Sequence, residues 1–309
     1  MTYSLNLSDE TLLAALKAWP LPEPLTIQQL PGGMTSEIWR VEAGNERFVA
    51  KYAYTTRQAF ERGLYAAELV ERHGITCGVP LRTKQGTLSI MVASAHGQSQ
   101  PLALLHYVPG ERLNLSEPGA ASLYGYLLGR AHSILLAGLD DWCAFDLYDF
   151  LLGEEPAVAA QPGLAPLIRH AIEAAREYEG RRTVTYGVIW ADAMEIRRDK
   201  ETGRIGIIDW GAIGRGPLLF DVALNELWHF PERSQAHREF MQAYLNEAPI
   251  SASELEGIKY YKALLWARQA KFYAYCVAEN VMLGGSTPTS NAENLAKSWR
   301  ELERSVANL

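Results

Sequence analysis

The sequence changes character near residue 108, and this change constrains the fold more than any other feature. Before it, short runs of β-type residues alternate with turn residues, and one longer stretch, residues 56–72, has the apolar spacing of a helix. After Pro109-Gly110, helical periodicity dominates. We therefore predict an α+β chain with a small antiparallel β-rich part over residues 1–108 and a larger, mainly helical part over residues 109–309.

The individual elements follow from apolar spacing and from the turn residues between them. In the first part we predict a helix that begins after Ser8, the helix 56–72, and strands over 25–30, 37–42, 48–54, 79–82, 88–92 and 102–108. In the second part we predict helices over 118–137, 165–178, 220–230, 237–246, 254–281 and 291–306. One all-β island, over 183–190, 195–198 and 205–209, lies among these helices.

Composition excludes several classes of function. The chain has 36 acidic and 29 basic residues, a formal net charge of −7, whereas a dedicated nucleic-acid or anionic-membrane binder needs a basic face. No apolar run approaches the ~18–20 residues of a membrane span, and no signal peptide is recognisable. Three scattered cysteines, Cys77, Cys143 and Cys276, indicate free thiols in a reducing compartment. We expect a cytoplasmic monomer or homodimer with a cationic or neutral small-molecule partner.

Two apolar strands of the β island each lead to an aspartate. Residues 186–189 precede Asp192, and Ile207-Ile208 precedes Asp209. A carboxylate at the end of an apolar strand points out of the sheet edge, where it can accept a proton or hold a divalent cation. The two acids therefore suit a general base and a metal ligand.

Residues 186–223 resemble the aminoglycoside phosphotransferase family, a branch of the protein-kinase-like fold that includes choline, homoserine and macrolide kinases. The family pattern is an aliphatic strand, His-(Gly/Ala)-Asp, an Asn, a hairpin, Ile-Asp-Trp and Gly-Pro-x-x-x-Asp-x-Ala. In the same order, residues 30–41 resemble the family's phosphate-loop hairpin, 48–51 its lysine strand and 104–110 its hinge. Ile-Asp-Trp alone would be a weak signal, but four motifs in order are a strong one.

The resemblance implies a bilobal protein-kinase-like fold and an O-phosphotransferase that uses ATP or GTP with Mg²⁺. Its acceptor would be a hydroxyl of a small molecule. We expect an antibiotic, and a metabolite of the choline or homoserine kinase type is the alternative. The acids Asp146, Asp149, Glu154 and Glu155 could contact a cationic acceptor, although a solvated loop explains them equally well.

The resemblance also implies residue roles. Asp192 would take the proton of the acceptor hydroxyl, and Asp209 would bind Mg²⁺, assisted by Glu195. Lys51 would hold the α- and β-phosphates, steadied by an acid of the helix 56–72. Glu61 and Glu68 are the acids available there, and Glu61 is preferred because it lies nearer the helix start.

The nucleotide base is expected at the hinge. Its hydrogen bonds would go to the backbone of His106, Tyr107 and Val108, with Leu105 and Ile208 as apolar neighbours. Asp221, in the last motif, we interpret as a structural helix cap.

The chain departs from the family pattern around Asp192. Trp190 replaces the His, the following loop is two residues shorter, and Glu195 stands where the family has a metal-binding Asn. We predict that Glu195 contacts Mg²⁺ directly or through water; the alternative is that it points to solvent.

A second alignment places Tyr186-Gly187-Val188 over His-Gly-Asp, which would leave Val188 at the catalytic position. The protein would then be a catalytically silent, nucleotide- or ligand-binding pseudokinase.

Overall fold

The computed structural model describes residues 7–31, 36–94, 97, 99–139, 147–153, 156–190, 192–211, 213–282 and 286–309. The expected phosphate-loop glycines Gly32 and Gly33, and the acids Asp146, Glu154 and Glu155, lie outside these residues.

The chain packs as two compact units. Among the described residues, the sheet unit comprises the chain up to Leu113 and the segment from Met194 to residue 211, and the helical unit comprises Asn114–Ala193 and Ile213–Leu309. The segment from Met194 to Ala212 thus packs with the N-terminal sheet, although it lies far along the chain. The boundary predicted at residue 108 for the two lobes stays a prediction.

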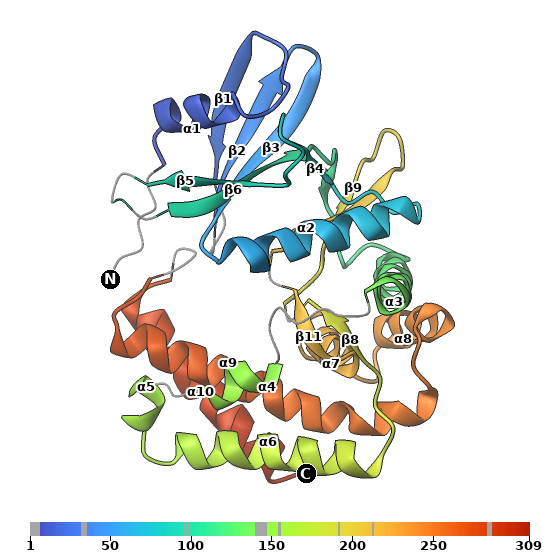
Figure 1. Ribbon diagram of the computed structural model, residues 1–309. Coiled ribbons are helices and arrows are strands. Elements are labelled where there is room, and N and C mark those ends of the chain that lie inside the picture. Colours follow the sequence, from blue (N-terminus) through green and yellow to red (C-terminus); the bar gives the residue numbers. More distant parts are fainter. Residues whose placement is uncertain are drawn as a thin grey trace. The chain divides into compact units, whose positions relative to one another are not determined.

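The sheet unit is built on an antiparallel sheet (Figure 1). Its strands are β1 (Leu25–Leu30), β2 (Ser36–Ala43), β3 (Glu46–Ala53), β4 (Pro80–Leu81), β5 (Ile90–Ala93) and β6 (Ser99–His106). They pair in the order β1-β2-β3-β6-β4, with β5 also on β6. Two helices belong to this unit, α1 (Asp9–Leu16) and α2 (Arg57–Arg72), and the side chains of Ser8 and Thr56 cap them.

The two helices pack against opposite faces of this sheet. Alternate residues of β3 and β6, among them Ala50 and Leu104, form one core with α1. The residues between them, Ala53 and Ala103, form another core with α2. Because side chains alternate along a strand, Lys51 lies on the face that carries Ala53 and Ala103.

A second, three-stranded sheet completes the sheet unit. It has the order β10-β9-β7, from β10 (Ile205–Ile208), β9 (Glu195–Arg198) and β7 (Glu111–Arg112). Gly206 forms a parallel bridge with Thr76, and the amide of Ile207 donates to the Thr76 carbonyl at 2.8 Å. The strand that leads to Asp209 is thereby tied to the segment after α2.

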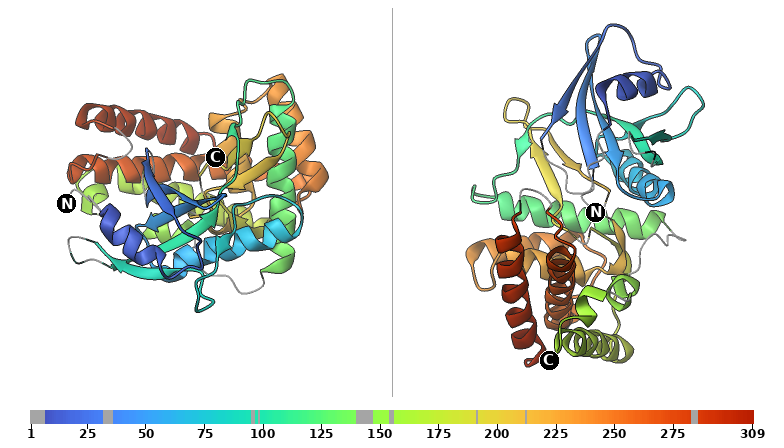
Figure 2. Two further views of the ribbon diagram at one scale, coloured as in Figure 1. Left: turned by 90° about the horizontal axis from the view of Figure 1, so that it is seen from above. Right: turned by 90° about the vertical axis from the view of Figure 1, so that its left-hand side faces the viewer.

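The helical unit surrounds a small two-stranded sheet. Its helices are α3 (Ala120–Gly138), α4 (Leu147–Leu152), α5 (Pro156–Ala159), α6 (Leu164–Arg181), α7 (Leu219–Trp228), α8 (Gln235–Glu247), the 3₁₀-helix η1 (Ala252–Gly257), α9 (Ile258–Ala278) and α10 (Pro288–Val306). Helix α9 packs against α6, α7 and α10, and α3 packs against α8. Figure 2 shows α10 alongside α9.

The strands of the predicted β island belong to two different sheets. Strand β8 (Tyr186–Ile189) pairs with β11 (Gly214–Pro217), which periodicity did not predict, and not with β9 or β10. Alternation of apolar residues identifies a strand but does not identify its partner. The predicted α+β class is confirmed, with an antiparallel N-terminal sheet and a helical C-terminal part. In the described part of the chain, every helix is too short or too polar to cross a membrane.

Candidate active site

The predicted phosphate-binding lysine and the predicted metal-binding aspartate are in direct contact. Nζ of Lys51 donates to Oδ1 of Asp209 at 2.5 Å, and only 12% of the Lys51 side chain is exposed. Lys51 comes from β3, and Asp209 directly follows β10. A charge-assisted hydrogen bond of this kind orients both groups.

Asp209 has an unusual backbone conformation. Its φ of +65° lies in the left-handed region, which aspartate tolerates better than most residues. Partial burial acts to raise the pKa of Asp209, but the Lys51 ammonium and a hydrogen bond from the Gly211 amide outweigh it and hold the pKa below its ordinary value. The carboxylate is therefore ionised at neutral pH. Its side chain is 60% exposed, so a cation can reach it.

Lys51 is not paired with an acid of α2, which differs from the expectation. Oε1 of Glu61 accepts from Nε of Arg57 at 3.0 Å and from Oγ of Ser89 at 2.7 Å. Glu68 is held by Arg82 instead. Arg57 lies one helical turn before Glu61, a spacing at which opposite charges stabilise a helix by about 0.2–0.5 kcal/mol. Glu61 as a nucleotide-site residue stays a prediction.

The predicted hinge has one amide left for a ligand. The amide of His106 donates to the Val79 carbonyl at 3.0 Å, and that of Tyr107 to the Arg47 carbonyl at 3.2 Å. The Val108 amide has no hydrogen-bond partner within the described residues, although Val108 is only 8% exposed. An unsatisfied amide in such a place is costly, so a ligand acceptor there would be stabilising.

Glu195 lies next to Asp209 along the hairpin. It is directly opposite Ile208, the residue before Asp209. Its Oε1 is 2.9 Å from Nη2 of Arg197, so this carboxylate already has a partner. Among the described residues, no group of three or more His, Cys, Asp or Glu is arranged to hold a metal. Each carboxylate thus has one cationic partner, and the Asp209 side chain is the more exposed of the two, at 60% against 27%.

Asp192 belongs to the helical unit. It is exposed, and its Oδ1 accepts from the amide of Ala193 at 2.7 Å. Val188, the alternative catalytic position, lies within β8 and is 5% exposed. A side chain inside a buried strand cannot reach a substrate, so this geometry favours the alignment that assigns catalysis to Asp192.

Asp221 has a larger role than the expected helix cap. Its Oδ2 accepts from the amide of Trp190 at 2.8 Å and lies 3.2 Å from Nε2 of His132. Nδ1 of His132 lies 3.0 Å from the hydroxyl of Tyr244, and all three polar side chains are at most 1% exposed. This buried network fixes the backbone two residues before Asp192. The Gly-Pro-x-x-x-Asp motif marked Asp221, but only the fold shows what it binds.

Arg268, on α9, is a charged residue that no motif indicated. Burial acts to lower its pKa, the charges of Asp192 and Asp221 act to raise it, and the pKa remains below the ordinary value. The interaction with both acids places a partly buried guanidinium near Asp192.

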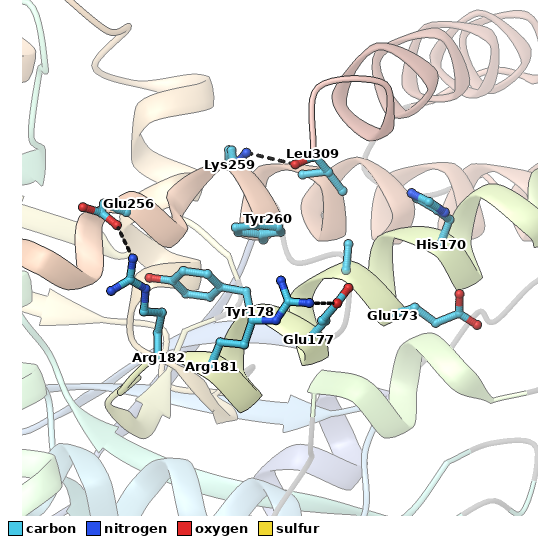
Figure 3. Close-up of a pocket in the computed structure, with 11 residues that line it drawn as sticks. His170, Glu173, Glu177, Tyr178, Arg181, Arg182, Glu256, Lys259, Tyr260 and Leu309 are labelled. Atoms are coloured by element: carbon cyan, nitrogen blue, oxygen red, sulfur yellow. Dashed lines mark hydrogen bonds and ion pairs between the residues drawn. The ribbon is translucent and has the colours of Figure 1, made fainter.

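A hollow of about 610 Å³ in the helical unit contains none of the predicted site residues (Figure 3). Its charged side chains are largely paired: Arg181 with Glu177, and Arg182 with Glu256 at 3.5 Å. Nζ of Lys259 donates to the carbonyl of Leu309 at 3.0 Å. With its cations compensated in this way, the hollow has little to attract an anionic substrate, and we do not assign the reaction to it.

Comparison with known proteins identifies a family and a relative of this chain. The sequence model of the phosphotransferase enzyme family matches residues 26–255. A homoserine kinase of Methylobacillus flagellatus is 24% identical over 236 residues, which cover 72% of this chain and 70% of that relative.

Solved structures share the fold over nearly the whole chain. An amicoumacin kinase in complex with AMP-PNP, Ca²⁺ and Ami has a TM-score of 0.73 at 14% identity, covering 96% of this chain and 93% of that one. A microcompartment-associated aminopropanol kinase has a TM-score of 0.68 at 16% identity, with 97% and 96% covered. For a choline kinase from Streptococcus pneumoniae the TM-score is 0.64 at 14% identity, with 97% and 99% covered. At such identities, these structures show the fold alone.

Proposed function

Because the chain belongs to the phosphotransferase enzyme family, we propose that it transfers the γ-phosphoryl group of ATP or GTP to a hydroxyl of a small molecule. The contact between Lys51 and Asp209 carries this proposal. It brings a largely buried cation and an exposed carboxylate together beside the expected hinge strand, since Lys51 is paired with Ala103 of β6. Phosphoryl transfer needs these two kinds of group to position and neutralise the phosphates.

The nucleotide would be held from its base to its phosphates within the sheet unit. The free amide of Val108 would donate to the base, with Ile208 beside it, and the ammonium of Lys51 would bind the phosphates. His106 and Tyr107 would contribute through their carbonyls, because their amides are already used.

The residues present fit a divalent cation. Mg²⁺ is commonly bound by one or two carboxylates together with substrate phosphates, so the absence of a larger acidic cluster among the described residues is no obstacle. Asp209 supplies an ionised, accessible carboxylate. The bound ion would neutralise charge on the transferred phosphoryl group. Glu195 would contact the ion through Oε2 or through water, because its Oε1 is paired with Arg197.

Asp192 would accept the proton of the acceptor hydroxyl. As the hydroxyl oxygen forms a bond to the γ-phosphorus, the bond from that phosphorus to the β–γ bridging oxygen breaks, and the nucleoside diphosphate leaves. The buried network of Asp221 and His132 would keep the backbone before Asp192 in one conformation. Arg268 would add positive charge nearby.

For the acceptor we propose an antibiotic, as in the structurally similar amicoumacin kinase. The similarity to a homoserine kinase over 72% of the chain favours a second candidate, a hydroxyl-bearing amino acid or amino alcohol.

Thermal melting tests the proposal. A nucleotide with Mg²⁺ at ~100 times its dissociation constant should add about 2.7 kcal/mol to the free energy of unfolding. A clear rise in melting temperature with ATP or GTP and Mg²⁺, followed by transfer of labelled phosphate to an antibiotic or an amino alcohol, would support it. No shift at millimolar nucleotide would contradict it, and binding without transfer to any acceptor would indicate a pseudokinase.

A further inference from the structure

Arg197 lies on the same face of the β9–β10 hairpin as Glu195 and Gly206. Side chains directly opposite each other on paired strands share a face of the sheet. Arg197 is opposite Gly206, and Glu195 is opposite Ile208. These four positions therefore form one face, and the other face carries Ile196 and Ile207, both at most 2% exposed.

The expected hinge packs onto the same face. A Cβ added to Gly206 would lie 2.6 Å from Cγ1 of Val108, so the Val108 side chain occupies the space where a side chain at position 206 would stand. Val108 therefore packs against Gly206, the residue directly opposite Arg197, whose own Cβ would be ~5 Å from a Cβ at position 206. Val108, whose amide has no hydrogen-bond partner within the described residues, thus packs on the residue opposite Arg197.

The guanidinium of Arg197 is bound at one nitrogen, and another of its nitrogens has no hydrogen-bond partner within the described residues. Nη2 is bound by Glu195 at 2.9 Å, whereas Nε is buried and has no hydrogen-bond partner in the described part of the chain. On its other side, Arg197 is directly opposite Arg112 of β7. Like charges in opposite positions are destabilising, and an electron-rich ligand on this face would relieve them.

We propose that Arg197 is a nucleotide-binding residue whose planar guanidinium lies against the base of the nucleotide, oriented by Glu195. This inference rests on the proposed function. Arginine stacks on aromatic rings through its flat, delocalised cation, and Glu195 holds that plane in place from one edge. Glu195 is then a positioning residue that acts through Arg197, in place of the metal-binding role that its motif position suggests.

Binding of adenosine and ATP to the full chain tests the contact. Arg197→Ala should weaken both by the same factor, roughly three- to thirtyfold, because both carry the base. The matched control Arg198→Ala removes the same charge from the opposite face of β9 and should leave both affinities unchanged. Arg197→Lys keeps the charge but not the plane, and should stay weakened. Weaker ATP binding with unchanged adenosine binding, or full rescue by lysine, would overturn the stacking contact.

Glu195→Gln separates the two roles of Glu195. If Glu195 positions Arg197, the variant should weaken adenosine binding, which involves no metal, and should weaken ATP equally with Mg²⁺ and with chelator. In the Arg197→Ala background it should have no further effect. An effect confined to Mg²⁺ and present in both backgrounds would identify a metal ligand and overturn this role. Failure of the unsubstituted protein to bind any nucleotide would instead contradict the proposed function itself.

Discussion

A Cβ atom added to Gly63 of α2 would lie 2.0 Å from the carbonyl oxygen of Trp210. Helix α2 therefore rests directly on the backbone next to Asp209, and a glycine is required for this approach. Trp210 is itself 4% exposed, and its Nε1 donates to the Ile207 carbonyl at 3.2 Å. The turn that carries Asp209 is thus packed between its own strand and α2.

Gly63→Ala should destabilise the protein, although alanine is the better helix former. Helix propensity favours the substitution by about 1 kcal/mol, but overpacking against backbone typically costs about 1–3 kcal/mol. Gly180, in α6, has no atom within 4 Å of an added Cβ. Gly180→Ala should therefore stabilise. Denaturant unfolding of both variants checks this, and a stabilised Gly63→Ala protein would show that α2 can move away from Trp210.

Lys51→Ala should weaken nucleotide binding and slow transfer together. The variant removes the cation that we propose binds the phosphates, and it leaves Asp209 without the Lys51 ammonium. Hydrogen bonds to charged groups contribute about 1.5–3 kcal/mol, so the nucleotide dissociation constant should rise roughly ten- to a hundredfold. Titration with ATP and Mg²⁺ measures it. Unchanged affinity and rate would make Lys51 an ordinary strand lysine.

The ion pair of Lys51 and Asp209 should contribute a pH-dependent stability. Because the folded pKa of Asp209 is depressed, its contribution is present above the unfolded value of ~3.8 and is lost as the pH falls through the folded pKa. The stability difference between the unsubstituted protein and Lys51→Met should therefore shrink as the pH is lowered from 6 towards 3. Exposure of Asp209 keeps the effect modest. Lys84→Met, which removes an exposed lysine whose ammonium donates to the Lys17 carbonyl and meets no carboxylate among the described residues, is the control and should show no such trend.

Asp192→Asn should lower turnover by ~10²–10⁴-fold while leaving nucleotide affinity nearly unchanged. The amide keeps the shape of the side chain but cannot accept the proton. Single-turnover transfer and nucleotide titration together measure the two effects. Normal turnover in this variant would show that another group is the base.

Asp221→Ala should destabilise the helical unit. It leaves the buried amide of Trp190 and the ring of His132 without their acceptor, which costs about 1–3 kcal/mol. Asp149→Ala, at an exposed acid of α4, should change stability by no more than ~0.5 kcal/mol. Urea unfolding curves compare the two. Equal stability of the two variants would remove Asp221 from the set of structural acceptors.

Most of the secondary structure was predictable because periodicity and capping are local. The strand 25–30 was predicted with its observed bounds, and the helices 56–72 and 291–306 to within three residues, since each combines apolar spacing with a turn or capping residue. The short helices α4 and α5 were not predicted, because a single turn shows too little of the helical period. Motif order brought Lys51 and Asp209 into the candidate site.

The sequence by itself determined which residues can carry charge, where strands and helices form, and the family resemblance, since all three are local or ordered along the chain. The tertiary structure determined which residues and strands are in contact. It paired Lys51 with Asp209 across 158 positions in preference to Glu61, and it gave β8 the strand β11 as its partner. It also packed Val108 against Gly206, the residue opposite Arg197, in space that a side chain at position 206 would fill. Which residues pair depends on the distances between competing partners and on the space that other side chains already fill. These distances and spaces are defined only in the folded chain.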